Sequence, residues 1–174
     1  KADRNQPKSS ENLFQKKYHR LLWLGFLIAF FNQLSGINFV LYYAPEILEK
    51  AGLGGAESLF NSIAIGIVNL VFTLIGVRLL DKLGRRQLII IGSIGYIFSL
   101  IMVGICFQYD LGPAMLLSFI CLFVASHAIG QGAVIWVFIS EIFPNRVRAY
   151  GQSWGTSTHW VFAALITLIT PFFI

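Results

Sequence analysis

Stretches without Asp, Glu, Lys or Arg dominate the chain. Five of them reach the length of about 20 residues that a helix needs to cross a bilayer; they cover residues 21–45, 58–77, 87–109, 111–140 and 149–174. Because charged side chains are costly in hydrocarbon, such windows predict transmembrane helices. Gly112 and Pro113 open the fourth window, so we expect its helix to begin near Ala114. The pattern therefore predicts an all-α integral membrane helical bundle with five spans, preceded by a polar segment at 1–20.

The basic residues follow the rule that cytoplasmic loops of membrane proteins are rich in Lys and Arg. With five spans, residues 1–20 and the loops at 78–86 and 141–148 lie on one side of the membrane. The loop at 46–57 lies on the other. Of the 13 Lys and Arg residues, 12 lie on the first side and only Lys50 on the second. We therefore expect the first side, with the linker, to be cytoplasmic, and the chain to cross the cell's inner or plasma membrane several times.

Composition supports this class and excludes others. Charged residues make up 12% of the chain, against about 25% in soluble domains, and the mean hydropathy is +0.72. The net charge of +5 comes from residues between the apolar windows rather than from one basic face, so it does not indicate nucleic-acid binding. Cys106 and Cys121 lie in apolar windows without the spacing of metal ligands. We predict no metal site, no cofactor and no enzymatic activity.

The stretch 32–43, NQLSGINFVLYY, places amide side chains in the middle of the first predicted span. Asn32, Gln33 and Asn38 are costly at that depth unless they face a cavity or a polar partner. The Ser-Gly dipeptide at 35–36 weakens the helix, because glycine lowers helical propensity and serine can bond back to the backbone. A broken helix that carries amides at the membrane midplane is typical of transporters that bind a polar solute.

Two charged turns lie on the predicted cytoplasmic side. The first, DKLGRR at 81–86, has a glycine where a side chain would clash in a tight turn. The second, SEIFPNRVR at 140–148, contains Pro144, which stops the fourth helix. These turns are either ordinary interfacial charge or a latch whose ion pairs hold one conformation and break in another. The cytoplasmic charge latch would consist of Asp81, Arg85, Arg86, Glu141 and Arg148.

Together these motifs resemble the sugar porter family of the major facilitator superfamily. The matching features are QLSGIN followed by YY in the first span, DxxGRR, and GxxxW running into SEIFPxxxR. The chain after the linker is similar to bacterial proton–xylose symporters and facilitative glucose transporters. The resemblance implies that the spans correspond to helices 7–11 of a twelve-helix fold. Residues 1–20 would then be cytoplasmic linker, and residues 21–174 a C-terminal transmembrane bundle that lacks its last helix.

The resemblance also implies functional residues. The sugar would be bound by Asn32, Gln33, Asn38, Asn69, Gly132, Trp136, His159 and Trp160, and Tyr42 and Tyr43 would form a gate over it on the outer side. Independently of the family, amides donate and accept the hydrogen bonds that sugar hydroxyls need, and aromatic rings pack on apolar C–H faces. Each amide taken alone also fits a hydrogen bond between helices, and each tryptophan alone fits packing or the lipid interface.

Several positions depart from the family pattern. Asn32 stands where a longer Gln is common, His159 replaces Gln or Asn, and GQGAVIW at 130–136 lacks the prolines that often precede this tryptophan. Gln131 is either an added polar contact or a hydrogen bond between helices. We expect His127 to be packed and neutral rather than a proton carrier.

Small residues within the spans predict close approach of helices, because the absence of a side chain lets two backbones meet. The examples in the second and third windows are Gly66, Gly76, Gly92 and Gly95.

Our first hypothesis is a proton-coupled symporter that moves a xylose- or glucose-like monosaccharide by alternating access. A proton-independent sugar facilitator is the alternative, and a sugar-sensing membrane receptor is a third reading. The expected partners are the monosaccharide, protons, the lipid bilayer and an N-terminal six-helix half of the same polypeptide. We accordingly expect this chain to be a piece of a longer protein.

Overall fold

The computed structural model describes residues 12–172, which form helices joined by short turns and contain no strand. In chain order the helices are α1 (His19–Leu34), α2 (Ile37–Tyr42), α3 (Ala44–Lys50), α4 (Gly55–Leu83), α5 (Arg85–Gln108), α6 (Pro113–His127), α7 (Ala133–Ile142) and α8 (Arg148–Ile169). Three short turns complete the described part, namely η1 (Lys16–Tyr18), η2 (Ala128–Gly132) and η3 (Thr170–Phe172). The predicted all-α fold is confirmed.

Four stretches of the described residues are long and apolar enough to cross a membrane. They are Lys16–Tyr42, Gly55–Leu83, Arg85–Gln108 and Pro113–Ile142, and they coincide with the first four predicted spans. The fifth predicted span folds as α8, a helix of 22 residues. Its first half contains Arg148 and several Gln, Ser and Thr residues, which lowers its hydropathy, so its insertion in the membrane stays a prediction.

The first span is broken where the Ser-Gly dipeptide predicted. α1 ends at Leu34 and α2 begins at Ile37, and Gly36 between them has a φ of 81°. This left-handed conformation suits glycine because a Cβ atom would make it strained. The hydroxyl of Ser35 donates to the carbonyl of Asn32 at 2.6 Å, which provides a partner for a backbone group at the end of α1.

The outer segment 46–57 was expected to be a loop, but its first part is helical. α3 covers Ala44–Lys50, with Pro45 in its first turn, where the missing N–H costs no helical hydrogen bond. Glu46 near the start and Lys50 near the end complement the helix dipole. Gly52, with a φ of 95°, follows the helix before α4 begins.

The two charged turns form as predicted. Gly84 separates α4 from α5 with a φ of 79°. α7 ends at Ile142, and Phe143 is extended with a ψ of 134°, the conformation that the residue before a proline prefers. Both turns therefore reverse the chain over a few residues.

Glycines allow α5 to cross the fourth span at backbone contact. A Cβ atom on Gly92 would lie 2.6 Å from the Cα atom of Gly130 and 2.7 Å from the carbonyl oxygen of Ser126. Gly76 and Gly95 also have close neighbours, with a built Cβ atom 3.0 Å from Ile129 Cα and 2.4 Å from Ser126 Oγ respectively. Gly66 makes no such close contact with the described residues 12–172, where nothing lies within 4 Å of its built Cβ atom.

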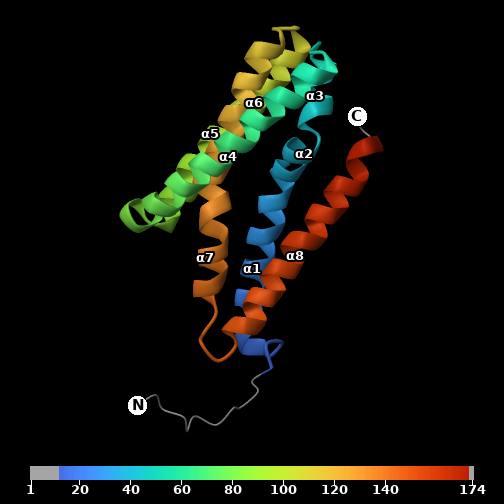
Figure 1. The fold of residues 1–174 in the computed structure, drawn as a ribbon. Helices are drawn as coiled ribbons and strands as arrows, with labels where there is room; N and C mark the ends of the chain where they lie inside the picture. Colours follow the sequence, from blue (N-terminus) through green and yellow to red (C-terminus); the bar gives the residue numbers. More distant parts are fainter. Residues whose placement is uncertain (1–11, 173–174) are drawn as a thin grey trace.

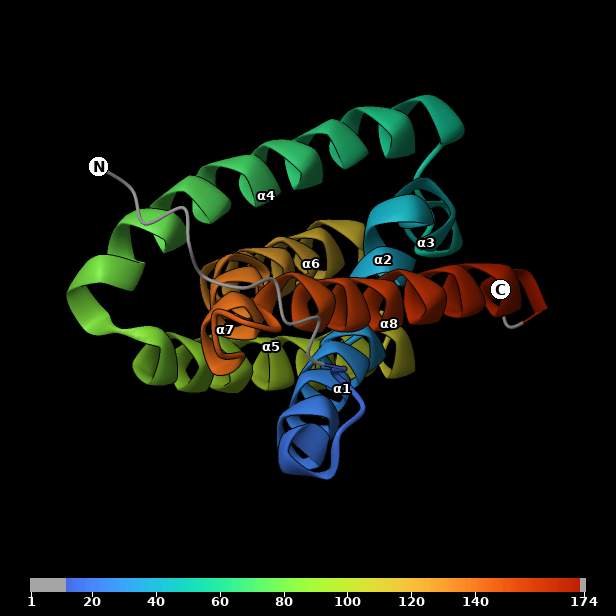
Figure 2. The ribbon, with the colours of Figure 1, turned by 90° about the horizontal axis from the view of Figure 1, so that it is seen from below.

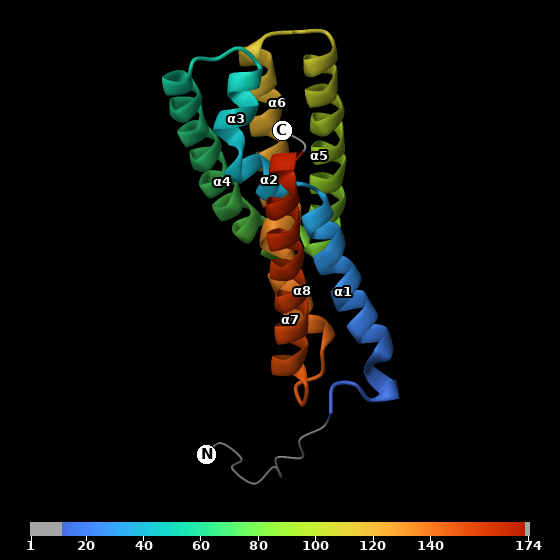
Figure 3. The ribbon, with the colours of Figure 1, turned by 90° about the vertical axis from the view of Figure 1, so that its right-hand side faces the viewer.

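Figure 1 shows an elongated bundle in which α3–α6 gather toward one end and α1, α7 and α8 toward the other. α6 lies between α4 and α5 (Figures 2 and 3), and it packs most extensively on α5. α8 runs along α1 and also contacts α7. Residues 1–11 of the predicted linker lie outside the described part, whereas Leu13 and Tyr18 are buried against α1 and Phe143. The broken first and fourth spans thus occupy the interior of the bundle.

The contact between Gly92 and Gly130 predicts that Gly92→Ala destabilises the protein. The added methyl group meets backbone atoms that cannot rotate away, so we expect a loss of about 1–3 kcal/mol of stability. Gly104→Ala is the matched control in α5, because nothing lies within 4 Å of its built Cβ atom; it should be neutral or stabilising by up to about 1 kcal/mol. Thermal unfolding of the full-length protein in detergent compares the two, and equal melting temperatures would contradict the packing.

Candidate functional site

A chain of polar side chains begins at the break of the first span. The Asn38 amide donates to Oε1 of Gln33 at 2.9 Å, and Nε2 of Gln33 lies 2.7 Å from Nε2 of His159 on α8. Gln33 is fully buried, with 0% of its surface exposed, and His159 is buried as well. With Gln33 Nε2 as donor, the imidazole nitrogen facing it must be an unprotonated acceptor. Three predicted site residues from α1, α2 and α8 therefore form one connected cluster.

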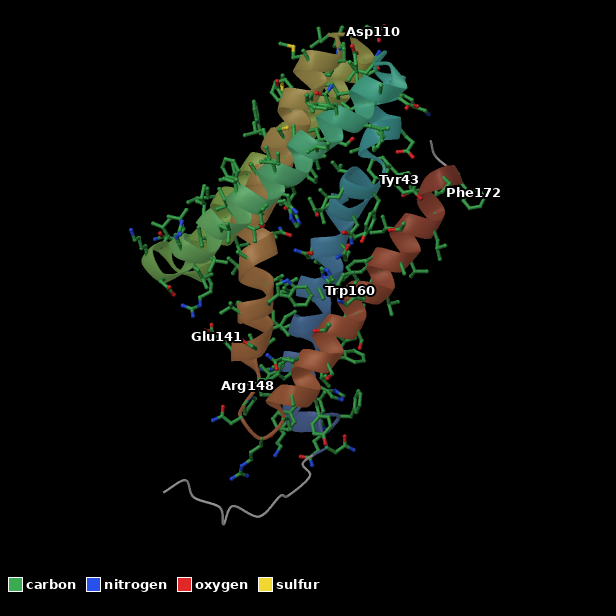
Figure 4. All side chains as sticks on the ribbon, viewed as in Figure 1. Tyr43, Asp110, Glu141, Arg148, Trp160 and Phe172 are labelled. Carbon is green, nitrogen blue, oxygen red and sulfur yellow. The ribbon has the colours of Figure 1, made fainter. Side chains whose placement is uncertain are left out.

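Two tryptophans flank this cluster. Between ring centroids, Trp136 on α7 lies 4.8 Å from His159 and Trp160 lies 5.5 Å from it, both edge-to-face. Figure 4 labels Trp160 part-way along α8. Trp136 and Trp160 are 40% and 55% exposed. Their indole surfaces therefore remain open to a ligand or to a further part of the protein.

The polar–aromatic cluster, which we define as Gln33, Asn38, His159, Trp136 and Trp160, has a clear chemical character. Its amides and imidazole donate and accept hydrogen bonds, and its indoles offer apolar faces. None of these side chains is a carboxylate or an ammonium group. Among the described residues no group of three or more His, Cys, Asp or Glu side chains is arranged to hold a metal ion. The arrangement suits a neutral solute with several hydroxyl groups.

Asn32 points into a different network from Gln33. Its Nδ2 donates to Oε1 of Gln131 on η2 at 3.3 Å. Gln131 in turn donates through Nε2 to Oγ of Ser93 at 3.4 Å and to the hydroxyl of Tyr96 at 3.3 Å, both on α5. We call these four residues the Gln131 network. Of the two readings of Gln131, the structure has the hydrogen bond between helices.

Two further residues expected in the site lie apart from the polar–aromatic cluster. Asn69 on α4 is half-buried, and in the described part of the chain its side chain forms none of the cluster's hydrogen bonds. Gly132 ends the π-helical turn η2, where a built Cβ atom would lie 3.5 Å from the carbonyl oxygen of His127. Its neighbourhood is therefore the buried His127 rather than the indole of Trp136.

The tyrosine pair separates into two environments. The hydroxyl of Tyr43 donates to the backbone carbonyl of Thr167 at 3.0 Å, which fastens α2 to the far part of α8. Tyr42 at the end of α2 is 58% exposed. In Figure 4, Tyr43 lies near the end opposite to Glu141 and Arg148, as the predicted topology requires.

The predicted charge latch is partly assembled. Arg85 after the first turn forms an ion pair with Glu141 at the end of α7, which joins the two charged turns. Nε of Arg148 donates to the carbonyl of Phe143 at 3.4 Å instead of pairing with Glu141. Asp81 and Arg86 are exposed and form no ion pair within residues 12–172. Only one of the expected ion pairs is thus present in this conformation.

Three residues of the interior were not assigned in advance to a site. Ser93 and Tyr96 are three residues apart on α5. This spacing places both polar side chains on one face of the helix, and it is the sequence feature that could have indicated a polar contact there. His127 is buried between the rings of Tyr96 and Phe123, with centroids 6.4 Å and 6.2 Å away, and its Nε2 has no partner among the described residues. It is packed, as predicted.

The fold of the described residues is a helical bundle with four stretches long and apolar enough to cross a membrane, and it holds a polar cluster in its interior. The sequence profile of the family described as "Sugar (and other) transporter" matches residues 1–174, so the chain belongs to this family of transporters. A glucose facilitated diffusion protein of Zymomonas mobilis is 34% identical over 167 residues, covering 96% of this chain and 35% of that protein. A D-xylose-proton symporter of Escherichia coli is 35% identical over 79% of this chain and 28% of its own length.

Solved structures agree with the family. The proton:xylose symporter XylE of the major facilitator superfamily, bound to 6-bromo-6-deoxy-D-glucose, matches with a TM-score of 0.80 and 32% identity, covering 91% of this chain and 35% of that one. The inward open conformation of the xylose transporter from E. coli matches with a TM-score of 0.74 and 31% identity, over 93% and 33% of the two chains. This chain spans about a third of the length of these relatives. The superfamily fold and the non-enzymatic class are confirmed.

The contact between Gln33 and His159 predicts energetic coupling. Gln33→Leu and His159→Leu should each lower the free energy of unfolding of the full-length protein. The loss in the double variant should be smaller than the sum of the two single losses by about 0.6–1.7 kcal/mol, the range found for hydrogen bonds between membrane helices. Unfolding of the four proteins in detergent gives this value. A control cycle pairs Gln33→Leu with Ser118→Ala, whose hydroxyl bonds only its own helix at Ala114; additivity in both cycles would exclude the contact.

Proposed function

We propose that the full-length protein carries a monosaccharide such as xylose or glucose across the membrane, and that this chain supplies much of the sugar site. The observation that carries the proposal is the polar–aromatic cluster at the break between α1 and α2. Three hydrogen-bonding side chains from separate helices meet there, between two partly exposed indole rings. The names of the relatives, which include glucose, arabinose and xylose carriers, support the same substrate class.

Sugar binding would exchange hydrogen bonds within the cluster for hydrogen bonds to hydroxyl groups. One hydrogen bond, from Asn38 to Oε1 of Gln33, is available for such an exchange. A sugar hydroxyl can both donate and accept, and therefore replaces either partner. Trp136 and Trp160 would pack on the C–H face of the ring. Because hydrogen bonds to the sugar replace hydrogen bonds within the cluster, the net gain in free energy on binding is small. Binding is then reversible, as a carrier requires in order to release the sugar.

Alternating access would use the broken helices. The break at 35–36 lies between Gln33 and Asn38, so bending there would move one wall of the site. Tyr42 and Tyr43 would close its outer side, and the Arg85–Glu141 pair would hold the cytoplasmic ends of α5 and α7 together in one conformation. The remaining two thirds of the protein, including an N-terminal helical half, would form the opposite wall.

We propose proton symport as the mode of coupling, with the linker cytoplasmic and the protein in the plasma or inner membrane. The named proton symporters among the relatives, from Bacillus subtilis and E. coli, support this mode. The facilitated diffusion protein of Z. mobilis supports the alternative of a proton-independent facilitator. The pH of the external medium distinguishes the two modes. When sugar is added outside de-energised vesicles, a symporter takes up protons with the sugar and makes the medium more alkaline. A facilitator leaves the pH of the medium unchanged.

Counterflow of labelled xylose and glucose into vesicles that contain the full-length protein tests the transport function. We expect exchange of at least one of these sugars. Gln33→Ala should weaken its apparent affinity about tenfold, because two hydrogen bonds worth about 0.5–1.5 kcal/mol each are lost. Gln108→Ala, at the exposed end of α5, is the control and should behave as wild type. Absence of exchange with every sugar would refute transport, and unchanged affinity in Gln33→Ala would refute the site.

Charge reversal tests the latch. Arg85→Glu and Glu141→Arg each replace attraction by repulsion at a partly exposed ion pair, whose strength is about 0–1 kcal/mol. Each single variant should therefore lower the counterflow rate about two- to fivefold, and the double variant should recover it. The predicted latch would be wrong if the double variant were as slow as the slower single variant.

A further inference from the structure

The Gln131 network lies beside the polar–aromatic cluster but shares no side chain with it. Gln131 uses both ends of its amide, since Oε1 accepts from Asn32 and Nε2 donates to Ser93 and Tyr96. These contacts join the last turn of α1 to η2 and α5. Gln131 therefore links three segments of the bundle through one side chain.

The two ends of this link are the two breaks in the helical spans. Asn32 lies three residues before Ser35, whose hydroxyl bonds the Asn32 carbonyl. Gln131 lies within the π-helical turn 128–132. Next to it, Gly130 is fixed against Gly92, because a Cβ atom on Gly130 would lie 2.7 Å from Gly92 Cα. The side of the link at η2 is therefore closely packed, whereas α1 ends two residues after Asn32, just before the break at Ser35 and Gly36.

Among the described residues, Gln131 is the side chain that accepts a hydrogen bond from Nδ2 of Asn32. The pair borders a cavity of about 210 Å³ that is otherwise lined by Leu27, Ile28, Phe31, Ile89 and Ile135. Asn32 itself is 3% exposed. If Gln131 withdrew, the Nδ2 of Asn32 would face apolar side chains, which is costly for a buried amide. The last turn of α1 would then rotate to find another partner.

Rotation of that turn would move the cluster. Asn32 and Gln33 are consecutive on α1, so their side chains project about 100° apart around the helix, from 3.6 residues per turn. Fixing the direction of Asn32 therefore fixes the direction of Gln33, which joins Asn38 to His159. We propose that Gln131 is a positioning residue for sugar binding, which acts through Asn32 by holding the amide-bearing turn of α1 in register with His159. This inference rests on the proposed transport function.

A length swap tests the proposal. Asparagine is one methylene shorter than glutamine, so Gln131→Asn opens the link by one carbon, and Asn32→Gln in the same protein restores its total length. We expect Gln131→Asn to weaken sugar binding by the full-length protein about three- to tenfold, the effect of one hydrogen bond between membrane helices. The Asn32→Gln/Gln131→Asn double variant should return to within about twofold of wild type.

Two controls separate positioning from general stability. Gln108→Asn makes the same substitution at the exposed end of α5 and should leave sugar binding unchanged. Tyr96→Phe keeps the ring and the link but removes one acceptor of Gln131, and should weaken binding less than Gln131→Asn. Calorimetric titration with xylose and glucose gives the affinities, and melting temperatures measured in parallel show whether each variant is folded. If Gln131→Asn does not fold, Tyr96→Phe/Ser93→Ala loosens Gln131 and should weaken binding about two- to fivefold.

The outcomes are distinct. Weaker binding that the swap rescues supports the proposal, because a role of Gln131 toward α5 alone would not be rescued by a change on α1. The positioning role of Gln131 is overturned if Gln131→Asn leaves the sugar affinity unchanged, or if Asn32→Gln does not restore an affinity that Gln131→Asn has lowered. In either case, sugar binding by the wild-type protein would still support the transport function. Absence of sugar binding by the wild-type protein would refute both.

Discussion

A buried amide that cannot be left without partners constrains the interior of this protein. Gln33 has none of its surface exposed, and an unsatisfied amide in an apolar environment costs several kcal/mol. Its two partners, Asn38 and His159, come from the other side of the helix break and from α8. The break at Ser35 and Gly36 brings Asn38 to Gln33, and the packing of α8 on α1 brings His159 to it. A ligand that offers equivalent hydrogen bonds can take the place of either partner.

The bundle divides its polar interior into two networks with separate tasks. Gln33, Asn38 and His159 form the part that faces the indoles of Trp136 and Trp160. Asn32 turns away to Gln131, which anchors the first broken span to α5 and to the second break. Under the proposed transport function, the first network would exchange hydrogen bonds with the sugar while the second keeps the helices in register.

The sequence was most informative where covalent geometry or burial leaves little choice. Long charge-free windows predicted the first four spans, the Ser-Gly dipeptide predicted the break at Gly36, and Gly84 and Pro144 predicted the two turns. It was less informative where a direction in space matters. Asn32 and Gln33 are neighbours with the same chemistry, yet they bond to different helices, and only packing decides which. Gly66 was expected at a helix contact and makes none with the described residues, because small size permits close approach without requiring it.

The most direct test of this account is a density map of the full-length protein with bound glucose or xylose. We predict that the sugar hydroxyls lie within hydrogen-bonding distance of Gln33 and Asn38, at the break between α1 and α2, with the sugar ring packed on Trp136 and Asn32 still bonded to Gln131. A sugar bound elsewhere in the protein, with Gln33 still bonded to Asn38 and His159 as in the free state, would contradict it.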